Sequence, residues 1–355
     1  MRFDKPTNDS FWRALHDEVG RAVRTPLATP GLWAKAAFYL ALVTTGYGWL
    51  MNGPPTFAAT AAAYGLFSLA ALLLVLNLAH DAAHDALTPS RLGNRIICEG
   101  CFALLGIDGH LWKMRHTQSH HIFPNINGCD ADIDYNPFLR LSPNHPWQRR
   151  HRWQHLYALL VYMIVHLHAI FVQDAIYIRQ TELANLRDIR HSPARIAAFA
   201  AFKLFYFTAL LALPIAFSPL PWIEVVAAYV LATALTSLAF VLTLIGTHFA
   251  DVNVFPAPGP DGQLGCTFVE HVLASSLDWA PTSRIATFLI GGLNAHVAHH
   301  LFPRVSHAHY RRISTAIARL AAQHRIDYHC TDLPGMIAGH FRHLRRMGER
   351  PAFLR

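Results

Sequence analysis

The sequence predicts an all-α integral membrane protein with four transmembrane helices, arranged as two hairpins, and a cytosolic helical cap. Hydrophobic residues make up 53% of the 355 residues and charged residues only 15%, a composition typical of membrane proteins. Two long segments are nearly free of charge, and each is interrupted by a short proline-rich turn. Lysine and arginine are absent from both turns. These observations together define the fold class and its orientation.

The first hairpin is predicted from residues 36–79, which contain no Asp, Glu, Lys or Arg. The sequence NGPP at residues 52–55 divides this stretch into two arms, with spans predicted at about 32–51 and 56–79. Each arm approaches or exceeds the roughly 20 residues that a helix needs to cross the hydrocarbon core. We therefore expect a transmembrane hairpin here.

The second hairpin extends from about Arg195 to Gly246 and is interrupted by SPLP at residues 218–221. The predicted spans are about 196–217 and 222–246. Lys203 is the one basic residue well inside this region, and we expect its long side chain to reach back to the membrane interface.

The distribution of basic residues predicts the orientation of the protein. Because both turns lack Lys and Arg, the positive-inside rule places the turns outside and the termini and the long middle segment in the cytosol. A shorter apolar segment, residues 155–175, is predicted to be interfacial or re-entrant rather than a fifth span. Of its three histidines, His166 and His168 point to different sides of a helix and are predicted to be structural.

Residues 1–30 form a separate amphipathic, cytosolic N-terminal segment before a single membrane domain at residues 31–355. The segment is charged throughout, so it is not a signal peptide. Its apolar residues recur at helical spacing. Such a helix either lies on the membrane surface or packs on the cytosolic part of the protein itself.

Histidine is the residue type that carries the functional signal. The chain has 24 histidines, and eight of them fall in three short clusters that contain pairs at i, i+3 or i, i+4 spacing. Residues at these spacings share one face of a helix, so their imidazoles converge as metal ligands do. The alternative, that all are structural, would have to explain three clusters. The clustered residues are His80 and His84, then His116, His120 and His121, then His296, His299 and His300.

Imidazole ligands suit iron, zinc or copper, and eight of them exceed what one ion can hold. The sequence therefore predicts a site for two metal ions. All three clusters are expected on the cytosolic side, because the first and last follow the returning arms of the two hairpins and the second lies in the middle segment. Asp81 and Asp85 beside the first cluster are either acceptors that orient ligand imidazoles or ordinary interfacial charges.

Two further motifs receive structural interpretations. Acidic and amide residues alternate at 130–136 as in a calcium-binding loop, but Tyr135 and Leu141 occupy the required glycine and glutamate positions. We expect a polar turn that supports the second histidine cluster. Cys98 and Cys101 form a lone Cys-x-x-Cys pair in an apolar stretch, and they are interpreted as packing residues rather than a redox or zinc site.

The clusters and their flanking residues resemble the histidine-box membrane fatty acid desaturases, most closely the front-end and bacterial linoleoyl-CoA desaturase branch. The resemblance extends from about His80 to the C-terminus. Its motifs are HDAAH at 80–84, HTQSHHIFPNINGCDADID at 116–134, PFLRLSP at 137–143, HRWQHLY at 151–157 and GGLNAHVAHHLFPRVSHAHY at 291–310.

This resemblance implies a non-haem diiron centre of two iron ions, with the eight clustered histidines as ligands, that uses O₂ and two electrons to desaturate an acyl chain. Many front-end members have Gln at the position of His296, and many carry a fused cytochrome b5 domain that has no counterpart here. The electrons are therefore expected from an external ferredoxin, flavodoxin or cytochrome with its reductase. The resemblance places such a protein in a bacterial inner membrane.

The substrates implied are acyl-CoA, acyl-carrier protein or acyl-lipid molecules. The net charge of +8 suits their anionic head groups and the lipid bilayer, and we expect no nucleic-acid partner. Eight histidines leave two irons short of full coordination, so a ninth ligand is sought. His248 ends the last predicted span, where the family places an extra histidine, and His271 lies beyond a loop rich in Pro and Gly. Position favours His248.

Three alternatives remain at this point. A related enzyme with the same centre could hydroxylate, ketolate or oxidatively decarboxylate its substrate. A membrane zinc hydrolase would normally place a glutamate general base beside its histidines, and all three clusters lack one. A bis-histidine haem carrier needs single facing histidines rather than doublets.

Overall fold

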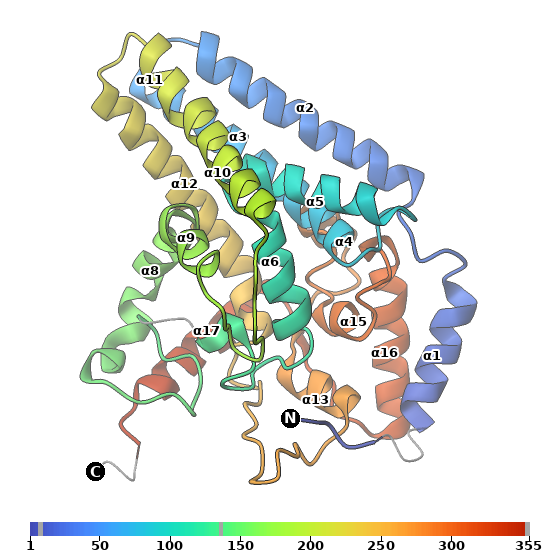
Figure 1. The fold of residues 1–355 in the computed structure, drawn as a ribbon. Coiled ribbons are helices and arrows are strands. Elements are labelled where there is room, and N and C mark those ends of the chain that lie inside the picture. Colours follow the sequence, from blue (N-terminus) through green and yellow to red (C-terminus); the bar gives the residue numbers. More distant parts are fainter. Residues whose placement is uncertain (6–9, 135–137, 352–355) are drawn as a thin grey trace. The chain divides into compact units, whose positions relative to one another are not determined.

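The described part of the chain is mainly helical, as the sequence predicts (Figure 1). The computed structural model describes residues 1–5, 10–134 and 138–351. The strands in these residues are β1 (Asp278–Trp279) and β2 (Cys330–Thr331), which pair in parallel. Within the described part of the chain, four helices could cross a membrane by length and composition: Phe57–Ala83, Arg149–Tyr177, Pro193–Phe217 and Trp222–Thr247. The predicted helical membrane fold is thereby confirmed.

This set of long apolar helices differs from the predicted spans in one member. The apolar segment at 155–175 was expected to be short, but turns at both of its ends extend it to a helix of 29 residues, Arg149–Tyr177. The first predicted arm forms α2 (Pro30–Asn52). Its 23 residues are long enough to cross a membrane, but α2 is not among the four helices that are also apolar enough to do so. Its Thr, Gly, Tyr and Trp residues lower its mean hydropathy.

The chain divides into two compact units, which are described separately. Unit 2 comprises residues 29–114 and 159–241 and contains the hairpin arms. Its elements are α2, α3 (Phe57–Leu74), the π-helical turn η1 (Val75–Ala79), α4 (His80–Ala83), α5 (Arg91–Leu104), α6 (Gly109–Arg115), α8 (Gln154–His168), η4 (Ala169–Gln173), α9 (Asp174–Tyr177), α10 (Pro193–Phe207), η5 (Thr208–Ala212), α11 (Leu213–Phe217) and α12 (Trp222–Leu244).

The first hairpin of unit 2 is closely packed. Gly46 of α2 lies so near α3 that a Cβ atom there would be 2.8 Å from the backbone nitrogen of Phe67. The Thr56 side chain accepts a hydrogen bond from the backbone N–H of Ala59, which satisfies an otherwise open donor at the start of α3. The turn predicted at Gly53-Pro54-Pro55 therefore leads directly into a capped helix.

Lys203 of α10 is held inside unit 2 rather than extended to the interface. Its ammonium group lies 2.8 Å from the Asp174 carboxylate and donates to the carbonyl oxygens of Gly106 and Ile170. The expectation that this lysine reaches back to the membrane interface is corrected, because three partners within hydrogen-bonding distance compensate its charge in place.

Cys98 and Cys101 are packing residues, as predicted. Both are buried in α5 as free thiols. Burial raises the pKa of each thiol to about 12, so both stay protonated and unreactive at neutral pH.

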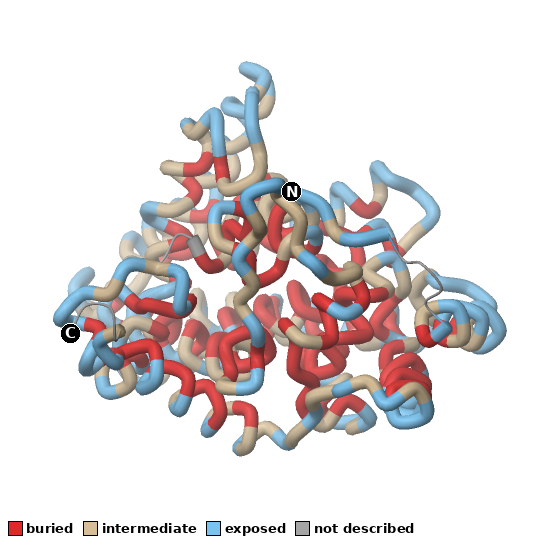
Figure 2. Tube along the Cα trace, turned by 90° about the horizontal axis from the view of Figure 1, so that it is seen from below, coloured by how far each residue is buried: buried red, intermediate tan, exposed pale blue. Residues whose placement is uncertain are grey.

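Unit 1 comprises residues 1–28, 115–158 and 242–355. Buried and exposed positions alternate along its longer helices, and Figure 2 shows buried and exposed positions along the chain as a whole. Its elements are α1 (Ser10–Ala22), η2 (His116–His120), α7 (Ala131–Asp134), η3 (Arg149–Trp153), η6 (Ile245–Thr247), α13 (Phe268–Ser275), β1, α14 (Arg284–Ile290), α15 (His296–Leu301), η7 (His307–His309), α16 (Tyr310–His324), β2 and α17 (Leu333–Gly348).

The N-terminal amphipathic helix α1 packs on the protein itself. Its apolar residues Phe11, Leu15 and Val19 are buried in a core that also contains Ile313 and Ile317 of α16. Of the two interpretations open from the sequence, packing on the protein itself is the one the structure shows. This core also includes Val297 and Ala298 of α15, so it supports the helix that carries the last histidine cluster.

Candidate metal centre

Four buried histidines of unit 1 form a compact group, His120, His248, His296 and His300. Their ligand atoms all lie within 4.8 Å of one another. His120 comes from the π-helical turn η2, His248 directly follows η6, and the other two come from α15. The group thus joins the second and third sequence clusters with the favoured candidate for the ninth ligand.

The imidazoles of His248, His296 and His300 turn Nε2 towards one another. The Nε2 atom of His248 lies 2.8 Å from that of His296 and 3.0 Å from that of His300. On the other side of the ring, Nδ1 of His248 donates to the carbonyl oxygen of Ser275 at 2.9 Å, and Nδ1 of His296 to that of Leu293 at 3.2 Å.

His120 is oriented by a carboxylate. Its Nδ1 lies 3.1 Å from Oδ2 of Asp130, and both residues are buried. The polar turn predicted at residues 130–136 therefore does support the second cluster. Of that stretch, Tyr135 and Asn136 lie outside the described residues.

These contacts fit a metal ion. With Nδ1–H bound to an acceptor, the Nε2 atom of a neutral imidazole carries a lone pair, and the lone pairs of His248 and His296, 2.8 Å apart, repel each other. A cation resolves the repulsion. Imidazole nitrogens about 2.0–2.1 Å from one ion lie roughly 3 Å apart when they bind at right angles. An acceptor on the second ring nitrogen is also the usual arrangement for metal-bound histidine.

Burial favours the neutral form of His248 and His300. Burial would also lower the pKa of His120, but the carboxylates of Asp130 and Asp132 outweigh it and raise that pKa. For His248, burial is the main cause that lowers the pKa well below its usual value, and the neighbouring His296 and His120 add to it. Burial likewise lowers the pKa of His300. Neutral imidazole is the form that binds metal.

A second set of histidines lies beside the first in unit 1. The Nε2 atom of His121 is 3.1 Å from that of His116 and 2.8 Å from that of His299. The Tyr310 hydroxyl lies 3.3 Å from Nδ1 of His299, and only its place in the last motif marks this partner in the sequence. His121, His299 and His300 form a group of their own, so His300 is shared between the two sets.

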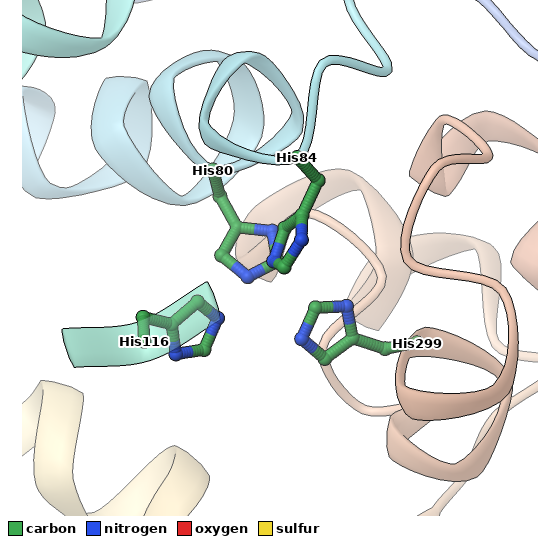
Figure 3. A group of neighbouring side chains, drawn as sticks. All are labelled: His80, His84, His116 and His299. Carbon is green, nitrogen blue, oxygen red and sulfur yellow. The ribbon is translucent and has the colours of Figure 1, made fainter. Parts of the chain in front are cut away.

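His80 and His84 belong to unit 2. Both are buried, at the start of α4 and just beyond its end, and their ring centroids are 5.0 Å apart. Figure 3 shows their rings side by side at the end of one helix. It also shows His116 and His299 of unit 1, whose rings are nearly parallel at 5.7 Å. The i, i+4 prediction for the first cluster is thus realised locally. Asp85 bonds to Lys113 at 3.3 Å, as an ordinary interfacial charge would.

His271 has a different environment from His248. Its Nε2 donates to the carbonyl oxygen of Pro124 at 2.7 Å, and it belongs to none of the metal-binding groups formed by the described residues. Burial lowers its pKa to about 4. His166 is also structural in its contacts, since Nε2 donates to the Leu105 carbonyl oxygen at 2.8 Å.

Sequence reasoning missed the residue that anchors α15. The buried carboxylate of Asp278 accepts hydrogen bonds from the backbone N–H of Val297 and from the Tyr328 hydroxyl. Burial raises its pKa to about 7, although both hydrogen bonds oppose the rise. No local motif marks Asp278, because its partners are distant in the sequence.

A mainly helical chain with long apolar helices and buried groups of facing imidazoles defines an integral membrane protein with a histidine-ligated metal centre. The sequence pattern of the fatty acid desaturases matches residues 52–332. The chain belongs to the fatty acid desaturase family and is an oxidoreductase.

Curated relatives extend over nearly the whole chain. The sn-1 linoleoyl-lipid 6-desaturase of Arthrospira platensis is 26% identical over 333 residues, which cover 92% of this chain and 88% of the relative. The sn-1 linoleoyl-lipid 6-desaturase of Synechocystis is 22% identical, covering 90% and 89%. An acyl-lipid (7-3)-desaturase of Diacronema lutheri is 28% identical, covering 98% and 77%.

Proposed function

We propose that this desaturase inserts a double bond into the acyl chain of a membrane lipid, with two iron ions as its cofactor. The observation that carries the proposal is the buried group of His120, His248, His296 and His300, in which the Nε2 atoms of the last three face one another while acceptors hold Nδ1 of the first three. Such a donor set suits a first-row transition metal.

We propose the eight clustered histidines and His248 as the iron ligands. His120, His248, His296 and His300 would hold one ion. The assignment of His80, His84, His116, His121 and His299 to the remaining positions rests on their sequence motifs and on the local contacts within each unit. His271 is proposed as a supporting residue instead, because its Nε2 is already engaged by a carbonyl oxygen.

The reaction removes two hydrogens from adjacent carbons and forms one C=C bond. O₂ accepts these two hydrogens, together with two electrons and two protons from outside, and is reduced to two molecules of water. The bound irons would supply the oxidising power. The protein's own part is to hold the ligand imidazoles in orientation, and to keep bulk water away from them through the burial of every one of these side chains.

The substrate assignment follows the relatives, whose names specify linoleoyl-lipid or acyl-lipid substrates. Acyl-CoA and acyl-carrier protein remain the other candidates from the sequence. The electrons would come from a separate ferredoxin, flavodoxin or cytochrome with its reductase. Basic residues cluster away from the hairpin turns, which supports an orientation with the termini and the metal centre in the cytosol of a bacterial inner membrane.

The test is expression in a host that lacks polyunsaturated fatty acids, with linoleate supplied and an electron-donor system coexpressed. Total fatty acids and separated lipid classes are then analysed by mass spectrometry. We expect a product two mass units lighter than its precursor, first in the glycerolipids and absent with the His300→Ala variant. A product sixteen mass units heavier than its precursor would identify a hydroxylase. Desaturated product confined to the acyl-CoA pool would overturn the lipid assignment.

The family assignment favours desaturation over the zinc hydrolase and haem carrier interpretations. Hydroxylation, ketolation and oxidative decarboxylation share the same type of centre, and the mass of the product distinguishes them from desaturation.

A further inference from the structure

We propose that Asn125 is a positioning residue that couples two metal-binding histidines, His120 and His248, through one buried hydrogen-bonded junction. The inference rests on the proposed metal centre and adds a residue that is not itself a ligand. It predicts that the Asn125 amide sets how tightly the group of His120, His248, His296 and His300 binds a metal ion.

The side-chain amide of Asn125 connects its own loop with two other segments of unit 1, one that contains His248 and Val254 and one that contains Ser275. Its Nδ2 lies 3.0 Å from the carbonyl oxygen of His248, 3.2 Å from that of Val254 and 3.3 Å from that of Ser275. Asn125 is fully buried. The amide orientation is unambiguous, since the opposite assignment would place Oδ1 against three carbonyl oxygens.

One branch of the junction fixes His248. The Ser275 carbonyl oxygen that faces the Asn125 amide also accepts the hydrogen bond from Nδ1 of His248 at 2.9 Å. The amide therefore contacts both the backbone of His248 and the group that sets its ring orientation. Because this ring places Nε2 2.8 Å from Nε2 of His296, a small rotation would disturb the whole group.

The other branch fixes His120. The backbone N–H of Asn125 donates to Oδ2 of Asp130 at 2.8 Å, and the same carboxylate oxygen lies 3.1 Å from Nδ1 of His120. Asn125 thus helps to orient the carboxylate that orients His120. The two branches connect η2 with the segment after η6, which are more than a hundred residues apart in the sequence.

His271 gives the junction its third support. Its Nε2 donates to the carbonyl oxygen of Pro124 at 2.7 Å, directly before Asn125. A histidine that sequence analysis considered as a ligand is therefore assigned a different task, namely to hold the loop that carries Asn125.

The residue type at position 125 is restricted for two separate reasons. The backbone there has φ of 62°, a left-handed conformation that Gly and Asn adopt more readily than most residues. The position also needs a side-chain N–H donor for three carbonyl oxygens. Glycine meets the first requirement and fails the second, so Asn125→Gly separates backbone conformation from the amide contacts.

The experiment measures Co²⁺ binding to the metal-free full-length protein in detergent, followed by the visible absorption of the bound ion. The variants are Asn125→Gly and Asn125→Asp, and the matched control is Asn144→Asp, whose amide donates to the Phe255 carbonyl oxygen at an exposed site. Replacing a residue that supports ligands in this way typically lowers metal affinity by about 10 to 100-fold.

We expect both Asn125 variants to weaken one of the two Co²⁺ sites by this factor and to alter its absorption bands, while the other site and Asn144→Asp resemble the unaltered protein. Circular dichroism is recorded for each variant to check that it is folded. A folded Asn125→Gly protein with unchanged affinity and spectrum at both sites would overturn the inference. Failure of the unaltered protein to bind Co²⁺ would instead contradict the proposed metal centre.

Discussion

At the scale of single residues, the partner of one ring nitrogen decides what the other nitrogen of a histidine can do. His248 and His271 are both buried histidines of unit 1. His248 gives Nδ1 to a carbonyl oxygen and turns Nε2 towards other imidazoles, whereas His271 gives Nε2 to a carbonyl oxygen. The first arrangement suits a metal ligand and the second a structural donor.

The roles of these histidines can be separated by mutation. We expect His248→Ala to lose one metal ion per chain and all desaturated product, because a ligand is removed. His271→Ala should retain part of its metal and activity, with a loss of about 10 to 100-fold in affinity or activity. His168→Ala is the control and should stay active. Metal analysis and fatty-acid profiling check these outcomes, and an active His248→Ala protein with full metal content would refute the assignment of His248.

Stability should depend on pH through buried histidines away from the metal groups. His343 of α17 donates Nε2 to the Leu141 carbonyl oxygen at 2.7 Å, and burial lowers its pKa to about 4. Arg346 and Arg140 also lower this pKa, whereas Asp251 raises it. The unfolded chain, with a histidine pKa of about 6.5, binds the proton first. The contribution of His343 is therefore full at pH above about 6.5 and is lost as pH falls towards 4.

This loss amounts to roughly 3 kcal/mol at most, because one pKa unit corresponds to about 1.4 kcal/mol. His343→Gln can keep the donor to Leu141 but does not titrate. We expect the apparent melting temperature of the unaltered protein to fall more between pH 7.5 and pH 5 than that of the variant. Equal falls in the two proteins would show that His343 does not contribute to the acid sensitivity.

The sequence was sufficient to find the histidine clusters, since helical spacing makes them visible within a few residues. It was not sufficient to separate His248 from His271 by their contacts. That distinction depends on Ser275, Pro124 and Asn125, which long-range folding brings to these rings.

At the scale of elements, α15 is too short to be stable by itself and depends on its surroundings. It has six residues, of which three are candidate ligands, and isolated helices of this length do not persist in water. Asp278 holds its N-terminal turn through the backbone N–H of Val297 at 2.8 Å. The Tyr328 hydroxyl in turn bonds to the other oxygen of this carboxylate.

Removing this hydroxyl should weaken the support of α15. We expect Tyr328→Phe to lower stability by about 1–3 kcal/mol, because it takes a hydrogen-bond donor from a buried carboxylate, and to lower metal content with it. The control is Tyr157→Phe, whose hydroxyl donates to the Phe138 carbonyl oxygen at an exposed site. Thermal unfolding and metal analysis test the pair. Equal behaviour of the two variants would remove Asp278 and Tyr328 from the support of the centre.

Orientation in the membrane is a separate prediction at this scale. In a cysteine-free background, single cysteines at Asn52 and Leu220 should react with a membrane-impermeant reagent from outside, because both hairpin turns lack basic residues. Cysteines at Arg149 and Arg179, at either end of the helix Arg149–Tyr177, should react only after permeabilisation. Labelling of the cysteine at position 179 from outside would mean that this helix crosses the membrane.

The hairpins were predictable because charge-free stretches and proline-rich turns are local signals. The extent of the helix Arg149–Tyr177 was not, since polar residues such as Arg149 and Asp174 at its ends conceal its length. The inward bonding of Lys203 was also hidden, because Asp174 and Gly106 reach it only in the folded chain.

At the scale of the whole molecule, the chain combines long apolar helices with a buried set of imidazoles. The family assignment establishes a desaturase, and the donor set of His120, His248, His296 and His300 gives the geometry of a metal site. The proposed oxidative chemistry depends on which metal ions the protein binds and on how many.

The most direct test of this claim is the metal content of the purified full-length protein, determined by inductively coupled plasma mass spectrometry beside an absorption spectrum. We expect about two iron atoms per chain and no haem band, because the donor set is imidazole and exceeds the needs of one ion. A protein that is active and contains mainly zinc, or one ion per chain, would contradict it.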